Sequence, residues 1–114
     1  MDTEREAQIK RQIEKVKRDL AALGDLRPGT LSTQHTVCSS PGCHCKADPP
    51  IKHGPYYHLG YKRKGKTSTK FIREKNVSAI QKQLKNYQTL KLLVDQWIEL
   101  ATELSNLRLA RDRG

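Results

Sequence analysis

Apolar side chains near the N-terminus recur at the spacing of an α-helix. Three or four positions separate each of Ile9, Ile13, Val16, Leu20 and Leu23 from the next, and charged residues fill the intervals. This spacing aligns the five side chains on one face over two heptads. The pattern predicts a helix over residues 4–23, within an N-terminal segment of residues 1–24, and Gly24 suits the position that ends it.

A longer helical pattern occupies the C-terminal third of the chain. One line of side chains, spaced three and four apart, consists of Tyr87, Leu90, Val94, Trp97, Ala101 and Leu104, and a second line, spaced seven apart, consists of Leu93, Leu100 and Leu107. The pattern predicts a helix over residues 76–110, within a segment of residues 74–112. We expect it to pack antiparallel to the first helix as a coiled-coil-like pair.

The two predicted helices differ in length. At about 1.5 Å per residue the second is roughly 50 Å long and the first about 30 Å. The first helix can therefore cover only part of the apolar stripe on the second. We expect a second copy of the chain or a partner enzyme to bind the remainder, through Leu90, Leu93, Val94, Trp97, Leu100 and Leu104.

The central residues divide into an irregular segment and a strand pattern. Residues 25–55 show no period and are rich in Pro and Gly, which predicts a loop. In residues 56–73, apolar side chains alternate at Tyr57, Leu59 and Tyr61, and the connection Arg63–Lys66 contains a glycine suited to a tight turn. This part of the chain predicts a β-hairpin, so the fold class is α+β in a single domain of residues 1–114.

All three cysteines fall in the irregular segment. Cys38, Cys43 and Cys45 have the spacing C-x4-C-x-C, and His53 follows shortly before the predicted hairpin. Three thiolates and one imidazole can surround a tetrahedral Zn²⁺, which would hold the loop in place of an apolar core. His35, His44 and His58 are the other histidines that could supply the fourth ligand. Because four protein ligands leave no open position, we expect the zinc to be structural.

Composition narrows the functional class. Only 35% of the chain is hydrophobic, and no stretch approaches the ~18 consecutive apolar residues of a membrane span. The charged N-terminus lacks the apolar run of a signal peptide, so we expect a cytoplasmic protein. No constellation resembles a catalytic triad, a phosphate-binding loop or a carboxylate pair. We therefore expect neither an enzyme nor a small-molecule substrate.

The net charge of +10 is concentrated in the centre of the chain. Residues 1–26 are neutral overall, whereas residues 27–76 carry ten basic and two acidic side chains. Seven of these cations lie between residues 62 and 75, more than are needed to protect a short sheet edge. Such a surface attracts phosphates. We expect contacts to DNA or RNA from Lys62, Arg63, Lys64, Lys66, Lys70 and Arg73.

Tyrosines and a histidine in the first strand of the predicted hairpin leave a second mode of contact open. Tyr56, Tyr57, His58 and Tyr61 could stack on unpaired bases. For Tyr57 and Tyr61, packing in the core is the favoured interpretation. An acidic protein partner of the cations is the alternative to nucleic acid.

Several short motifs occur together along the chain. They are Arg27-Pro28-Gly29 with Leu31, the cysteine cluster, His53-Gly54-Pro55-Tyr56-Tyr57 and Gly65-Lys66. From about residue 27 to residue 107 the chain resembles a family of small bacterial and archaeal proteins that form a domain of unknown function. The resemblance implies a zinc knuckle with a hairpin, encoded near mobile elements. We expect an accessory protein that binds nucleic acid, DNA more than RNA, and assists a recombinase or transposase. A protein–protein adaptor is the alternative.

Overall fold

The computed structural model describes residues 2–36, 42–43 and 53–112. Its elements are α1 (Asp2–Ala21), β1 (Thr30–Thr36), β2 (His53–Arg63), β3 (Lys66–Ile72) and α2 (Glu74–Asp112). The α+β prediction is confirmed, and the long helix has the predicted bounds. Over the described residues, no helix is long and apolar enough to cross a membrane.

The chain divides into two compact units. The helical unit comprises residues 1–26 and 85–114, and the sheet unit comprises residues 27–84.

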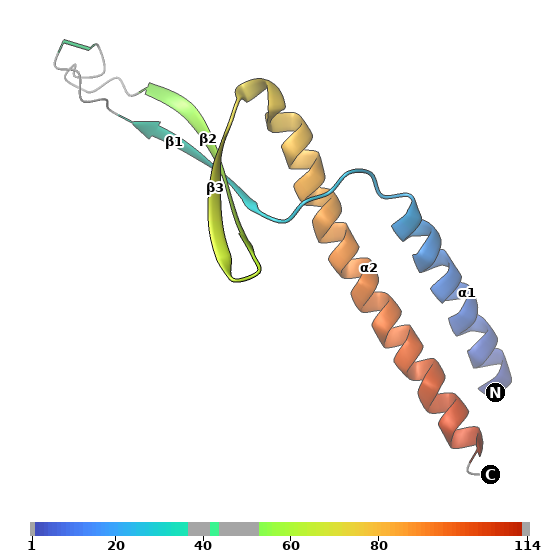
Figure 1. The fold of residues 1–114 in the computed structure, drawn as a ribbon. Helices are drawn as coiled ribbons and strands as arrows, with labels where there is room; N and C mark the ends of the chain where they lie inside the picture. Colours follow the sequence, from blue (N-terminus) through green and yellow to red (C-terminus); the bar gives the residue numbers. More distant parts are fainter. Residues whose placement is uncertain (1, 37–41, 44–52, 113–114) are drawn as a thin grey trace. The chain divides into compact units, whose positions relative to one another are not determined.

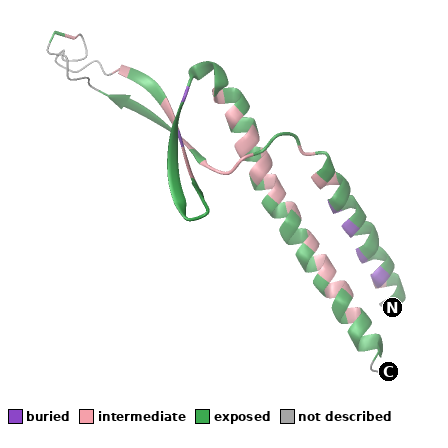
Figure 2. Cartoon of the chain, viewed as in Figure 1, coloured by how far each residue is buried: buried purple, intermediate pink, exposed green. Residues whose placement is uncertain are grey.

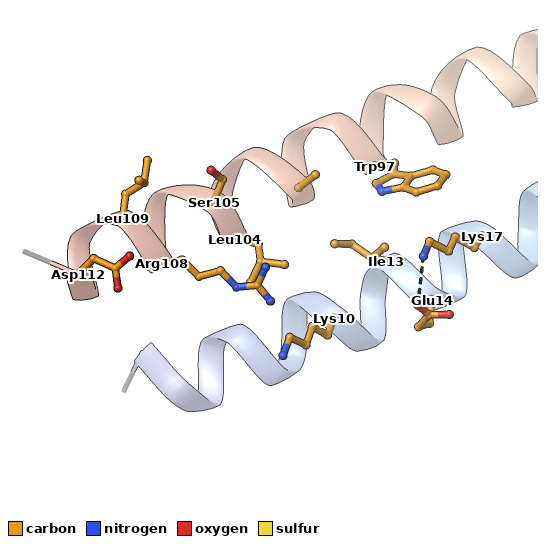
Figure 3. Close-up of a pocket in the computed structure, with 11 residues that line it drawn as sticks. Lys10, Ile13, Glu14, Lys17, Trp97, Leu104, Ser105, Arg108, Leu109 and Asp112 are labelled. Carbon is orange, nitrogen blue, oxygen red and sulfur yellow. Dashed lines mark hydrogen bonds and ion pairs between the residues drawn. The ribbon is translucent and has the colours of Figure 1, made fainter.

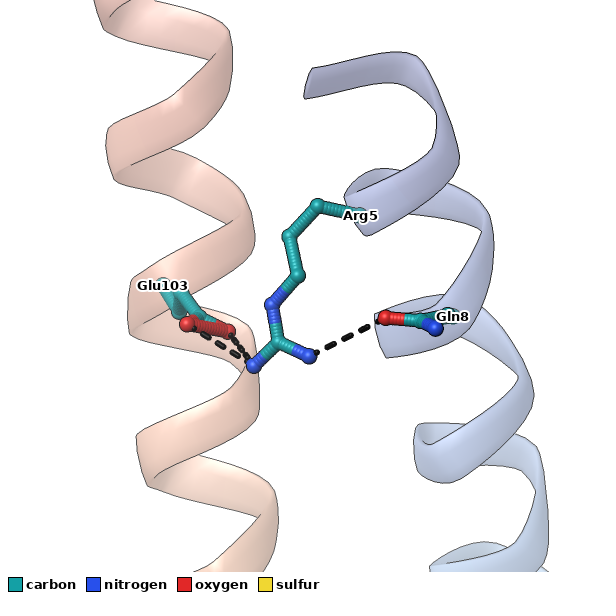
Figure 4. A network of polar contacts seen from close by, with 3 residues as sticks. All are labelled: Arg5, Gln8 and Glu103. Carbon is teal, nitrogen blue, oxygen red and sulfur yellow. Dashed lines mark hydrogen bonds and ion pairs between the residues drawn. The ribbon is translucent and has the colours of Figure 1, made fainter. Parts of the chain in front are cut away.

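In the helical unit, α1 and the C-terminal part of α2 lie side by side and antiparallel (Figure 1). Ion pairs between the N-terminal turns of α1 and the C-terminal turns of α2 support this orientation. Arg5 Nη2 donates to Glu103 Oε2 over 2.6 Å and a second arm of the same guanidinium reaches Gln8 (Figure 4). Arg111 Nη1 donates to Glu6 Oε1 over 2.7 Å, and the Glu6 side chain is buried.

The core of the helical unit lies along α1. Ile9, Ile13 and Val16 are buried, as the heptad pattern predicts, and Leu20 and Leu23 are half-buried (Figure 2). No residue of α2 is buried. Burial is therefore one-sided: α2 covers the apolar face of α1, whereas α1 covers only part of the apolar surface of α2.

The sheet unit contains three antiparallel strands in the order β1-β2-β3. Arg63 pairs with Lys66, so only Lys64 and Gly65 connect β2 to β3. Both connecting residues have positive φ, 52° and 77°. A two-residue type I′ turn requires positive φ at both positions and matches the twist of the strands. The predicted hairpin and its turn are confirmed.

The prediction of an irregular loop over residues 25–55 is wrong at Thr30–Thr36, which form β1, and at residues 53–55, which begin β2. Only Leu31 in this strand is not exposed, so the apolar alternation that marks a half-buried strand is missing. Threonine favours the extended conformation, and pairing with β2 supplies the hydrogen bonds. The extended conformation of such a strand depends on pairing with the neighbouring strand, and its sequence shows no hydrophobic period.

The sheet has one packed face and one open face. Leu59 and Ile72 are buried on the packed face, where Leu31 pairs with Leu59. The Arg27 guanidinium lies 4.8 Å from the centroid of the Tyr61 ring on the same face. A Cβ added to Gly29 would stand 2.9 Å from Leu59 Cδ1 and 3.0 Å from the Gly60 carbonyl oxygen. The segment that begins the sheet unit therefore covers this face at a distance that only glycine permits.

We expect Gly29→Ala to lower the free energy of unfolding by about 1–3 kcal/mol. The substitution combines the clash with Leu59 and a φ of 141°, which L residues rarely adopt. Chemical denaturation followed by circular dichroism measures the change. Gly60→Ala is the matched control, because its Cβ would meet no atom within 4 Å. Equal stability of the two variants would contradict the close packing of Gly29.

Candidate nucleic-acid interface and metal cluster

The six predicted phosphate contacts surround the tip and outer strand of the hairpin. Lys62 and Arg63 end β2, Lys64 is in the turn, Lys66 and Lys70 are on β3, and Arg73 joins β3 to α2. All six side chains are exposed. The register separates them: Arg63, Lys66 and Lys70 share a face with Leu59, whereas Lys62 is on the face of His58. The cations thus enclose the hairpin rather than forming a flat patch.

These cations lack carboxylate partners within the described part of the chain. All ion pairs among the described residues join side chains of the helical unit. Arg63 and Lys66 are direct cross-strand partners, and like charges in that position destabilise a hairpin. The positive charge at the tip therefore does not serve the stability of the sheet, and it is available to an anion from outside.

One thiol and one imidazole of the predicted metal cluster lie in contact. Cys43 Sγ is 3.0 Å from His53 Nε2, and His53 begins β2 opposite Thr36 of β1. Cys38, Cys45 and His44 lie outside the described residues. Of the histidines with described positions, His53 is shown in contact with Cys43, whereas His58 packs against Phe71 in the sheet.

The distance between these two atoms suits a shared metal ion after a small adjustment. Two ligands of a tetrahedral Zn²⁺, with bonds of about 2.3 Å to sulfur and about 2.0 Å to nitrogen, stand about 3.5 Å apart. Cys43 and His53 need to separate by only about half an ångström to meet this geometry. Within the described residues no group of three possible ligands occurs, so zinc stays a prediction.

The apolar surface of α2 in the helical unit is only partly covered. Of the predicted partner contacts, Leu90, Leu93, Trp97, Leu100 and Leu104 are half-buried and Val94 is 39% exposed. Ile98 and Leu109, which the heptad analysis missed, are 58% and 60% exposed. With Val94 they define an exposed stripe at helical spacing. The missed signal was the spacing of four from Val94 to Ile98.

A groove of about 700 Å³ runs between α1 and α2 in this unit. Ile13, Trp97 and Leu104 contribute its apolar surface, and Lys10, Arg108 and Asp112 are among its polar residues (Figure 3). Lys17 Nζ lies 5.3 Å from the Trp97 ring and pairs with Glu14. Mixed charges of this kind fit a protein surface better than a phosphate backbone.

We expect the purified chain to contain about one zinc ion, held by four ligands. Cys43→Ser and His53→Ala should lose most of it, because each removes a ligand. Metal content by atomic emission, and the thiolate bands of the cobalt-substituted protein, measure the effect. His35→Ala and His58→Ala are the matched controls. Loss of zinc in either control, with retention in His53→Ala, would contradict His53 as the fourth ligand.

Comparison with known proteins identifies the family but no activity. Neither the curated proteins nor the solved structures contain a match. The model of one family matches residues 6–82, which include most of α1, the whole sheet and the first turns of α2. The match therefore begins earlier than the motif resemblance, which starts near residue 27, and ends before the exposed stripe of α2. The chain belongs to the family described as a domain of unknown function, DUF6788.

Proposed function

We propose that this protein is a non-enzymatic, nucleic-acid-binding accessory factor that contacts DNA or RNA through its basic hairpin. The observation that carries the proposal is the positive charge at the hairpin without a carboxylate partner in the described residues. Phosphate backbones bind such surfaces because binding releases condensed counterions. A two-stranded ribbon is also narrow enough to enter a major groove. DNA is favoured over RNA, and Zn²⁺ at the cysteine cluster would hold the base of β2.

The second part of the proposal concerns the role of the protein in the cell. The resemblance in motifs supports a factor that assists a recombinase, transposase or other mobile-element enzyme. The exposed stripe of Val94, Ile98 and Leu109 supports docking of a second copy or of that enzyme. Both roles use the hairpin for nucleic acid and the helical unit for assembly.

Binding to short DNA and RNA should weaken steeply between ~50 and ~200 mM salt. The variant Lys62→Gln, Arg63→Gln, Lys66→Gln should bind more weakly, with the slope of log affinity against log salt reduced by about 2–3. It leaves Lys64 unchanged, because the positive φ of Lys64 supports the turn. Fluorescence anisotropy with labelled oligonucleotides measures both quantities.

The matched control is Lys10→Gln, Arg11→Gln, Arg18→Gln. It removes the same number of positive charges from α1. The three side chains are exposed and form no ion pair with other described residues. We expect it to bind nearly as well as the unchanged chain. An equal loss in both variants would show that net charge, and not the hairpin, governs binding. No binding by the unchanged chain would refute the proposal.

The exposed stripe also favours a second candidate function, a protein–protein adaptor. An apolar stripe at helical spacing on a helix surface is a common docking site for another helix. In this reading the cations of the hairpin would meet an acidic protein, and nuclease treatment would leave the complex intact.

Self-association through the stripe gives a separate prediction. The chain should sediment as a dimer at tens of micromolar, and Ile98→Glu should sediment as a monomer, because it buries a charge in the interface. Gln88→Glu, the same charge at an exposed polar position of α2, should remain dimeric. A monomeric unchanged chain would contradict self-association and leave the stripe to a different protein.

A further inference from the structure

Three aromatic rings gather on the open face of the sheet. Tyr56 and His58 are two residues apart on β2, and His58 pairs with Phe71 of β3. The centroid of the Phe71 ring lies 6.4 Å from that of Tyr56 and 6.1 Å from that of His58, and the ring planes are inclined at 52° and 74°, so each ring presents its own face. We call these three residues the aromatic platform.

Two of the three rings are exposed although the chain has few aromatic residues for its core. Phe71, the one phenylalanine, is 60% exposed, Tyr56 is 36% exposed, and His58 is half-buried. Their neighbours Ile72 and Leu59 point to the packed face and are buried there. The rings of Tyr56 and Phe71 therefore contribute little to the core. An exposed cluster of large rings marks a binding surface more often than a single exposed apolar side chain does.

The surroundings of the platform are open and positively charged. Gly60 follows His58 on the same face, and a Cβ there would meet no atom within 4 Å. Lys62 comes next on that face, and exposed Arg73 follows β3 directly. The described residues of this segment, 53–73, include no acidic side chain. An apolar protein segment would need the rings alone, whereas a nucleotide needs flat rings for its base and cations for its phosphate.

We infer that the aromatic platform of Tyr56, His58 and Phe71 binds unpaired bases of a single-stranded nucleic acid by stacking. The inference rests on the proposed nucleic-acid function and names its substrate class. Bases in a duplex are stacked on one another and offer only their edges in the grooves, so they cannot lie on the platform. Aromatic side chains on an exposed sheet hold two or three bases in other proteins that bind single strands. Lys62 and Arg73 would contact the adjoining phosphates.

The test compares one sequence of about 12 nucleotides as single-stranded DNA, single-stranded RNA and duplex DNA. Anisotropy titrations use the full chain and two variants. Phe71→Leu keeps an apolar side chain and removes the ring, whereas Phe71→Trp keeps a ring. We expect both single strands to bind more tightly than the duplex. Phe71→Leu should weaken single-strand binding by about 5- to 100-fold and leave duplex binding unchanged, and Phe71→Trp should bind as the unchanged chain does. The DNA and RNA arms show which strand is preferred.

A second measurement reports stacking directly. The double variant Phe71→Trp, Trp97→Phe has its one tryptophan on the platform. Its fluorescence should be quenched by the single strands and not by the duplex, because only unpaired bases can stack on the ring.

Failure of the inference differs from failure of the proposed function. Salt-sensitive duplex binding without single-strand preference, and with no effect of Phe71→Leu, would overturn the platform and leave the basic hairpin as the site. Equal single-strand binding by Phe71→Leu and Phe71→Trp would also overturn it. So would a dimer that Phe71→Leu dissociates, because the rings would then face a second copy. Absence of all binding would overturn the proposed function itself.

Discussion

Consecutive side chains of a β-strand point to opposite faces, and in β2 this alternation determines what each face of the sheet can do. Leu59 is fully buried against the backbone at Gly29, so Tyr57 and Tyr61 share its face. Tyr56 and His58 must then point the other way, and pairing carries Phe71 to the same side. A shift of one residue in the register of β2 would place Tyr56 and His58 on the packed face and Leu59 on the open face. The close packing of Gly29 thus holds the rings in the open.

Charge is arranged differently in the two units. In the helical unit, Arg5 pairs with Glu103 and Arg111 with Glu6, so each of these two cations has a carboxylate partner on the other helix. The half-exposed pair of Arg5 with Glu103 adds little stability, whereas the pair of Arg111 with Glu6 includes a buried carboxylate. Both pairs favour the antiparallel alignment over its alternatives. At the hairpin, Arg63 faces Lys66 instead. The contrast explains why a net charge of +10 can act at one place on the molecule.

The helices and the hairpin turn could be predicted from the sequence, because their patterns are local. The seam of Ile9, Ile13 and Val16 and the glycine of the turn each signal within a few residues. β1 could not be predicted, because a strand that is exposed except at Leu31 has no hydrophobic period. Residue type and spacing predicted that Cys43 and His53 share a zinc ion; these two side chains lie in contact, and the zinc stays a prediction. Tyr56 and His58 were candidates for base stacking from the sequence, but Phe71 was not, because its position depends on register: Phe71 joins Tyr56 and His58 only when β3 pairs with β2.

In the turn between β2 and β3, Lys64 meets two separate requirements: a positive charge and a backbone with positive φ. Lys64 supplies a charge, yet its φ of 52° is a conformation that asparagine or glycine adopts more readily. A family member with asparagine followed by glycine at this turn would keep the shape of the hairpin and lose one cation. Natural variation at this position can therefore distinguish selection for charge from selection for folding: a lysine retained there, against its backbone preference, would indicate selection for the charge.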